Sequence, residues 1–221
     1  MDQETKKLKE SLIEFGKLIN QNNLVVGPGG NLSIRVGDVC YITPSGLSFT
    51  EIKSDDLVGI DIESNTIISG TKRPSSETLM HISIYKVRKE INAIFHIHPP
   101  YTIAVVGADI EIKPLFPDFA LYLGEKVKNI EYVTPCTAEL ATIMAKEISN
   151  VDAIAMKKHG LTVIAKNMKE AWVKTLLVEE SDKMIVAART VGKEAVITKE
   201  EIDKINNLEI EQYRKKLMKD N

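Results

Sequence analysis

Two of the four histidines in this 221-residue chain flank a single isoleucine, in the sequence His96-Ile97-His98. In a strand, residues i and i+2 project from the same face, so both imidazoles could reach one cation. Many such pairs are incidental, but this one ends an uncharged apolar run, where two rings without polar partners would be costly to bury. We therefore expect His96 and His98 to bind a metal ion.

Two further residues could complete a metal site. His159 lies in the sequence KKHGL, where Gly160 would let the backbone pass close to a ligand. Glu77 directly follows Pro74-Ser75-Ser76 at the start of an expected helix. Three histidines with one carboxylate or an open position are the ligands of a catalytic zinc-type site. Taken singly, His159 could instead be a solvated turn residue, and Glu77 a carboxylate that stabilises a helix start.

The expected cofactor is one divalent metal ion per chain. Neutral imidazoles and a carboxylate suit Zn²⁺ best, and they also accommodate Mn²⁺, Co²⁺ or Fe²⁺. Because reference histidine pKa values lie near ~6.5, protons should displace the ion below about pH 6. His81, four residues after Glu77, is expected to be structural, since three ring ligands are already present.

Three turns are rich in glycine, hydroxyl and amide residues, and could bind an anion. They are GGNLS at 29–33, TPSG at 43–46 and the pair Ser75-Ser76. Each offers backbone N–H groups to phosphate oxygens, and Ser75-Ser76 also stands at a helix N-terminus. The chain has neither a Walker loop nor a dinucleotide fingerprint. As isolated motifs these turns are weak signals.

The elements that must position these residues follow from hydrophobic periodicity and turn residues. The pattern predicts an α/β layered domain in which a largely antiparallel sheet is favoured. The expected helices are residues 3–22, 75–90, a helix that starts near 102, 137–148 with Thr137 as N-cap, 167–192 and a charged tail at 198–221. The expected strands lie within 24–46, 57–70, 91–98 and 152–165. Residues 113–119 are expected to form a loop.

Composition and charge limit the possible partners. A formal charge of −2 gives no basic surface for nucleic acid, and no apolar run is long enough to span a bilayer. A charged N-terminus without a following apolar segment leads us to expect a cytoplasmic protein. Cys40 and Cys136 form no disulfide framework and are both expected to be small buried residues.

The motifs GGNLS, TPSG, RPSSE, HIHPP and KHG, in this order, resemble the class II aldolase/adducin family. The resemblance runs from Leu8 to about Arg189. It implies a single three-layer α/β/α domain over residues 1–221, with a central, mainly antiparallel sheet and a helical tail, 199–221, that could close the active site. Family members are commonly homotetramers with the site between subunits.

The resemblance also implies roles for particular residues. It assigns the metal to His96, His98 and His159, with Glu77 as a further ligand or general base. It assigns the substrate phosphate to a pocket formed by Asn31, Ser45, Gly46, Ser75 and Ser76.

The implied reaction is a metal-dependent cleavage of a ketose phosphate, such as a fuculose 1-phosphate or a 5-deoxypentulose phosphate, to dihydroxyacetone phosphate and an aldehyde. Alternatives are a C4 epimerase of a pentulose phosphate, a dehydratase or decarboxylase, and, in another class, a non-catalytic adducin-like binding module.

The residue that acts as the acid on the aldehyde side of the substrate is less clearly indicated by the sequence. Family aldolases carry a tyrosine after the HxH strand, but 114–119 has none, and Asp118 falls near that position. Asp118 could equally be a loop or N-cap residue. Tyr122, one helical turn on, could substitute, and Tyr213 in the tail resembles a second family tyrosine that closes the site.

Overall fold

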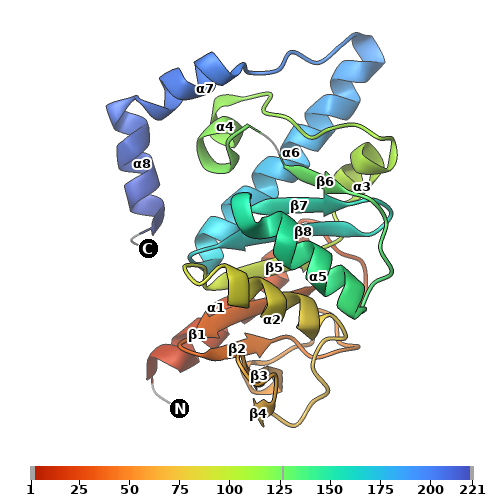
Figure 1. Ribbon diagram of the computed structural model, residues 1–221, viewed down its shortest axis with the longest axis vertical. Coiled ribbons are helices and arrows are strands. Elements are labelled where there is room, and N and C mark those ends of the chain that lie inside the picture. The colour runs from red at the N-terminus through yellow and green to blue at the C-terminus, as the bar shows by residue number, and fades with distance from the viewer. Residues whose placement is uncertain (1–2, 126, 220–221) are drawn as a thin grey trace.

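The segments expected to be extended form one sheet. A computed structural model of the chain describes residues 3–125 and 127–219, and within these ranges eight strands lie in the order β4-β3-β2-β1-β5-β8-β7-β6 (Figure 1). Every neighbouring pair is antiparallel except β6 and β7. The strands are β1 (Asn31–Val36), β2 (Val39–Ile42), β3 (Val58–Asp61), β4 (Ile67–Ser69), β5 (Ala93–Ile97), β6 (Lys128–Ile130), β7 (Ala153–Met156) and β8 (Gly160–Ala165).

Helices cover both faces of this sheet. The helices are α1 (Gln3–Gln21), α2 (Thr78–Val87), α3 (Pro100–Gly107), α4 (Pro117–Leu123), α5 (Ala138–Glu147), α6 (Met168–Val191), α7 (Lys199–Asn206) and α8 (Glu209–Lys219). Apolar residues of α2 and α5 pack on one face, and those of α1, α3 and α6 on the other. Figure 1 shows α2 and α5 in front of the sheet and α6 behind it. The expected three-layer α/β/α architecture with a mainly antiparallel sheet is confirmed.

Strand β5 is the central strand that carries the histidine pair. Phe95 and Ile97 belong to the core between the sheet and α1, α3 and α6, whereas Ile94 belongs to the core under α2 and α5. Because side chains alternate along a strand, His96 shares the α2 side with Ile94. The apolar run is buried on both faces, which is why it lacks the alternation of a half-exposed strand.

Several expected boundaries need correction. The loop expected at 113–119 ends earlier, because α4 begins at Pro117, whose fixed φ suits the first turn of a helix. The tail comprises two helices, α7 and α8, and residues 220–221 lie outside the described residues. Strand β6 was not expected, since three residues are too few to show a period. Among the described helices, none is both long and apolar enough to cross a bilayer.

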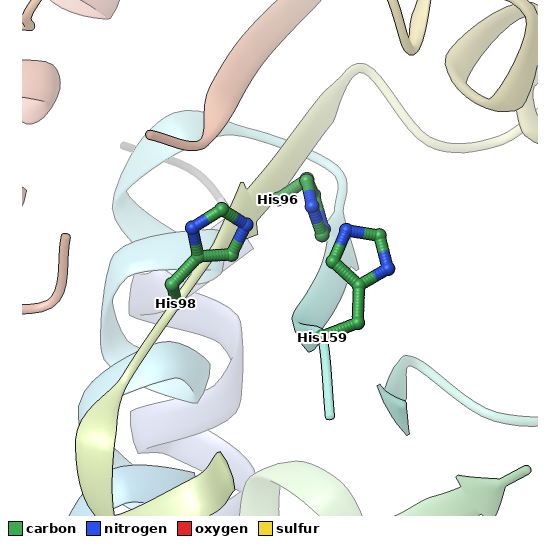
Figure 2. A group of neighbouring side chains, drawn as sticks. All are labelled: His96, His98 and His159. Carbon is green, nitrogen blue, oxygen red and sulfur yellow. The ribbon is translucent and has the colours of Figure 1, made fainter. Parts of the chain in front are cut away.

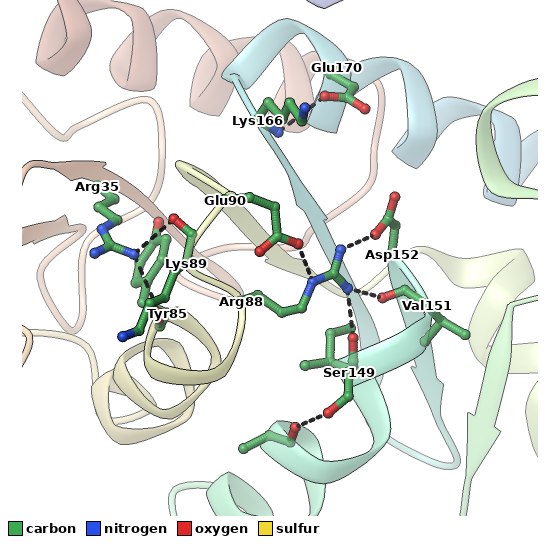
Figure 3. A network of polar contacts seen from close by, with 12 residues as sticks. Arg35, Tyr85, Arg88, Lys89, Glu90, Ser149, Val151, Asp152, Lys166 and Glu170 are labelled. Atoms are coloured by element: carbon green, nitrogen blue, oxygen red, sulfur yellow. Dashed lines mark hydrogen bonds and ion pairs between the residues drawn. The ribbon is translucent and has the colours of Figure 1, made fainter.

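Arg88, at the end of α2, ties that helix to the segment preceding β7 (Figure 3). Its Nη1 donates to the backbone oxygens of Ile148 and Val151 at 2.7 and 2.8 Å, and its Nη2 donates to Asp152 Oδ1 at 2.8 Å. Asp152 in turn accepts from Lys174 of α6 at 2.7 Å. This network links the C-terminal end of α2 to the segment before β7 and to α6.

Candidate metal and substrate site

The three candidate histidine ligands converge at one end of the paired strands β5 and β8. His96 lies opposite Thr162 in the β5–β8 register, and His98 follows the last residue of β5. His159 stands in the β7–β8 turn, directly before β8. Figure 2 shows the three rings gathered in one place, and one nitrogen from each lies within 4.8 Å of the others.

Two glycines permit this convergence. A Cβ on Gly160 would lie 2.7 Å from Cδ2 of His98, and a Cβ on Gly30 would lie 2.8 Å from the backbone oxygen of His96. Gly30 also has a φ of 72°, in the left-handed region that favours glycine. The glycines of the GGNLS and KHG motifs therefore let two loops close around the histidines.

Glu77 lies beside these rings, as the N-cap residue just before α2 rather than inside its first turn. Its Oε2 is 3.0 Å from His96 Nε2, and its Oε1 is 3.4 Å from His159 Nε2. Burial alone would raise the pKa of the Glu77 carboxyl. The interaction with His96 and the hydrogen bond from Asn31 outweigh burial and hold that pKa well below its usual range.

The site has the unsatisfied atoms that a metal ion would satisfy. Glu77 Oε1, His98 Nε2 and His159 Nδ1 are buried without a hydrogen-bond partner among the described residues, and His96 Nε2 faces Oε2 of Glu77. Such orphaned atoms are rare in folded proteins and call for a partner. His96 Nδ1 lies 3.1 Å from Thr162 Oγ1, and a proton on Nδ1 would leave Nε2 as a free lone pair. The donor set therefore fits a divalent cation.

Burial also keeps the rings in the form that binds metals. Burial lowers the pKa of His98 and of His159 to about 4, and the charge of His96 acts in the same direction. Neutral imidazole is the metal-binding form of histidine. Both rings are therefore neutral, and able to bind, over the physiological pH range.

A cavity of about 300 Å³ opens in front of this cluster. It brings together residues from distant parts of the sequence: Gly29, Gly30, Asn31, Pro44, Ser45, Gly46, Ser75, Ser76, Glu77, His98 and His159 are among its lining residues. His96, which is fully buried, is not among them. A larger hollow of about 630 Å³ lies against α1 and the start of α6, and no predicted site residue lines it.

The two serine-containing turns are held side by side by backbone hydrogen bonds. Ser45 N donates to Arg73 O at 2.9 Å, and Ser75 N donates to Thr43 O at 3.1 Å. Gly46 has a φ of 83°, which favours glycine at that point of the turn. The residues predicted to bind phosphate thus line the same cavity as His98 and His159.

Asn31 lines this cavity, but both ends of its side chain are engaged. Its Nδ2 donates to Glu77 Oε2 at 3.0 Å, and its Oδ1 accepts from His81 Nε2 at 2.6 Å. Because Nδ2 carries two hydrogens and the contact with Glu77 uses one, these contacts do not exclude the Asn31 side chain from phosphate binding.

The loop from Glu131 to Thr137, between β6 and α5, was missed as part of the site. It contributes Pro135 and Cys136 to the cavity wall. The expectation that Cys136 is buried is wrong, because its thiol is exposed and its φ is 65°; Cys40 is buried as expected. The sequence did contain a signal of this exposure. Cys136 lies between a proline and the N-cap Thr137, where a turn is expected rather than a core element.

The three candidate acids lie apart from this cavity in the same chain. Asp118 is on α4, where its Oδ1 lies 2.8 Å from Nη2 of Arg214 on α8. Tyr122 follows on α4, and Tyr213 on α8 is 57% exposed. None of the three lines the cavity in front of the histidines. The ion pair between Asp118 and Arg214 links α4 to α8, and the three candidate acids lie outside the cavity beside the metal cluster.

The chain is similar in sequence and in fold to proteins of one known family. A family model described as the class II aldolase and adducin N-terminal domain matches residues 10–186. An L-fuculose phosphate aldolase of Methanococcus maripaludis is 36% identical over 168 residues, covering 76% of this chain and 90% of that protein. A 5-deoxy-D-ribulose 1-phosphate aldolase of Bacillus thuringiensis is 30% identical over 203 residues, covering 90% and 93%. A solved L-fuculose 1-phosphate aldolase superposes with a TM-score of 0.86 at 32% identity, covering 94% of this chain and 96% of that one.

Proposed function

Because this chain belongs to the class II aldolase and adducin family, we propose that it is a metal-dependent lyase that cleaves a sugar phosphate to dihydroxyacetone phosphate and an aldehyde. Relatives named for L-fuculose phosphate and for 5-deoxy-D-ribulose 1-phosphate support a ketose or deoxyketose 1-phosphate as substrate.

One observation carries the proposal. Three imidazoles and Glu77 gather beside a cavity that the Ser45 and Ser75 turns also line. This arrangement combines a cation site with backbone and hydroxyl donors for an anion. A substrate with a phosphate near its carbonyl would span the two.

The residues have distinct tasks in the proposed reaction. The turns at Ser45 and Ser75 bind the phosphate and so fix the reacting carbons. His96, His98 and His159 would hold the cation, which supplies Lewis-acid stabilisation of the negative charge that develops on the substrate oxygens. As the bond between C3 and C4 breaks, its electron pair remains on the dihydroxyacetone phosphate fragment. Glu77, ionised at the start, takes the proton of the C3 hydroxyl and passes it to C3, and the proton released from the C4 hydroxyl restores the one lost from the C3 oxygen.

The proton of the C4 hydroxyl needs a second group. Asp118, Tyr122 and Tyr213 lie outside the cavity of their own chain, so their proposed role is to complete the site of a neighbouring subunit. The tail at 199–221 would then close that neighbour's site.

We further propose Zn²⁺ as the ion, with one per chain, and a homotetramer as the assembly. Imidazole and carboxylate ligands suit zinc, although Mn²⁺, Co²⁺ and Fe²⁺ share them. The exposed free thiol of Cys136 supports a cytoplasmic, reducing location.

The test is product formation with defined substrates. Zinc-loaded protein is incubated with L-fuculose 1-phosphate and with 5-deoxy-D-ribulose 1-phosphate, and dihydroxyacetone phosphate is measured by coupled NADH oxidation. We expect release of this product by the wild type and none by His96→Ala, the matched control. An epimeric ketose phosphate without free aldehyde would point to the epimerase alternative. No product from protein that holds one zinc per chain would contradict the aldolase assignment.

A further inference from the structure

A chain of hydrogen bonds runs from the candidate base into the protein interior. Glu77 Oε2 accepts from Asn31 Nδ2 at 3.0 Å, and Asn31 Oδ1 lies 2.6 Å from His81 Nε2. His81 Nδ1 lies 2.7 Å from Ser33 Oγ, which lies 2.9 Å from the Tyr85 hydroxyl. All five side chains are buried.

These five residues come from one face of helix α2 with its N-cap and from one face of strand β1. Glu77, His81 and Tyr85 are spaced four residues apart, so they lie along one face of α2 and its N-cap. Asn31 and Ser33 are two residues apart on β1, so they share one face of that strand. The helix and the strand therefore interleave their polar side chains inside an otherwise apolar layer.

The chemistry of the end groups sets the direction of every hydrogen bond. The ionised Glu77 carboxylate can only accept, so the amide of Asn31 must present Nδ2 to it and Oδ1 to His81. His81 Nε2 must then carry a hydrogen. Burial lowers the pKa of His81 to about 3, so the ring is neutral, and its Nδ1 accepts from Ser33. Ser33 Oγ accepts in turn from the Tyr85 hydroxyl.

This chain of hydrogen bonds determines the orientation of the Glu77 carboxylate. The chain occupies Oε2 and leaves Oε1 without a hydrogen-bond partner among the described residues, directed toward His159. A carboxylate with one oxygen fixed cannot rotate freely, so the other oxygen is presented in a single orientation.

We propose that Asn31 and His81 are positioning residues that fix Glu77 with Oε1 toward the metal and substrate, which gives His81 a role beyond that of a structural core histidine. This inference rests on the proposed function of Glu77 as the base. The hydrogen-bond directions themselves do not depend on it.

The first experiment needs neither metal nor substrate. Long-range ¹H–¹⁵N NMR of the metal-free protein reports which ring nitrogen of His81 carries the proton. We expect a neutral ring protonated at Nε2. A ring protonated at Nδ1, or at both nitrogens at neutral pH, would overturn the proposal whatever reaction the protein catalyses.

The second experiment compares variants of the zinc-loaded protein. Loss of an outer hydrogen-bond partner typically costs about 10-fold to 100-fold in activity, so His81→Leu should lower kcat by roughly that factor while KM and the zinc content per chain change little. His81→Gln should recover most of kcat, because a glutamine can donate to Asn31 and accept from Ser33. Ile84→Val, a buried apolar change on the same helix, is the control for packing and should leave kcat unchanged.

The outcomes separate the two proposals. A His81→Leu protein that is folded by circular dichroism with kcat within twofold of wild type would refute the positioning role. Equal losses in His81→Leu and His81→Gln would also refute it, because they would indicate a packing role alone. A wild type that releases no dihydroxyacetone phosphate but shows the expected His81 tautomer would refute the aldolase assignment and leave the hydrogen-bond chain standing.

Discussion

At the scale of single residues, burial decides how the metal ligands respond to pH. Reference pKa values suggested loss of metal below about pH 6. Because burial lowers the pKa of His98 and His159 to about 4, protons compete with the metal for these rings only at lower pH. A lowered histidine pKa widens the pH range in which the ring is neutral and can bind a metal, so burial shifts metal release to lower pH.

We therefore predict that one equivalent of zinc per chain is retained on dialysis at about pH 5.5 and released as the pH approaches ~4. His96→Ala, His98→Ala and His159→Ala should each reduce zinc binding severely, whereas His81→Ala should not. Elemental analysis after dialysis at a series of pH values measures this. Release of zinc from the wild type already at about pH 6 would contradict the effect of burial.

Glu77 allows a second prediction at this scale. Glutamine has nearly the same shape and can still accept from Asn31, but it cannot exchange a proton at neutral pH. Glu77→Gln should lower kcat by roughly 100-fold or more, with KM and zinc content less affected. Steady-state kinetics with the product assay would reveal this, and a kcat within threefold of wild type would exclude Glu77 as the base.

At the scale of secondary-structure elements, α6 holds the start of α3 through two buried carboxylates. Glu179 accepts from the backbone N–H groups of Tyr101 and Thr102, at 3.1 and 3.0 Å. The Thr102 hydroxyl lies 3.0 Å from Glu179 Oε2 and 2.6 Å from Asp182 Oδ2. One hydroxyl hydrogen cannot serve both carboxylates, so Asp182 is best satisfied when protonated, donating to Thr102. Burial raises the pKa of Asp182 to about 8, with the charge of Glu179 acting in the same direction.

This pair predicts a dependence of stability on pH. Between the unfolded pKa near ~3.9 and the folded value of about 8, the folded protein binds a proton that the unfolded chain releases. The Asp182 contribution to stability therefore falls as pH rises, by up to about 1.4 kcal/mol per pH unit. Asp182→Asn, which keeps a donor for Thr102, should gain stability relative to wild type as pH rises from about 5 to 8.

Urea denaturation across this pH range measures the effect, with Asp203→Asn, an exposed change on α7, as control. A difference between Asp182→Asn and wild type that does not change with pH would argue that Asp182 is ionised in the folded protein.

The loop between β6 and α5 gives a further prediction, because it brings an exposed thiol into the cavity. Alkylation of Cys136 by iodoacetamide should add bulk beside His159 and abolish product formation, and bound substrate should slow the reaction. Cys40 should not react, since burial raises its pKa to about 12. Cys136→Ser should remain active after the same treatment. Equal inactivation of Cys136→Ser and wild type would show that the modification acts elsewhere.

At the scale of the whole molecule, α4 and α8 carry the aldehyde-side candidates away from the cavity of their own chain. Their ion pair, Asp118 with Arg214, holds the two helices together. If these residues serve a neighbour's cavity, an assembly of two different inactive chains contains some complete sites.

We predict that chains with His96→Ala, mixed and refolded with chains that combine Asp118→Ala, Tyr122→Phe and Tyr213→Phe, recover part of the wild-type activity. Each variant alone should be inactive or nearly so. Product assays on the purified hybrids test this. Full activity of the triple variant alone, or no recovery in hybrids, would argue that every site is built within one chain.

The local pattern of the chain determined much of this protein. Alternation and turn residues predicted strands within 152–165 and the helices at 3–22 and 167–192, because these elements are long or are bounded by strong turn residues. The spacing of His96 and His98 placed both on one strand face, since that relation holds in any β-strand. The motifs of glycine, serine and histidine indicated the family, whose model matches residues 10–186.

Only the tertiary structure decided which distant residues meet. The pairing of β1 with β5 and of β5 with β8 brings Asn31 and Thr162 to His96, and no local pattern contains that register. The exposure of Cys136, the separation of Asp118 from the cavity and the contacts of His81 likewise depend on packing between elements far apart in the chain. Side-chain type and spacing define what each residue can do chemically, whereas burial and long-range pairing define which partners it has and therefore its charge state and its role.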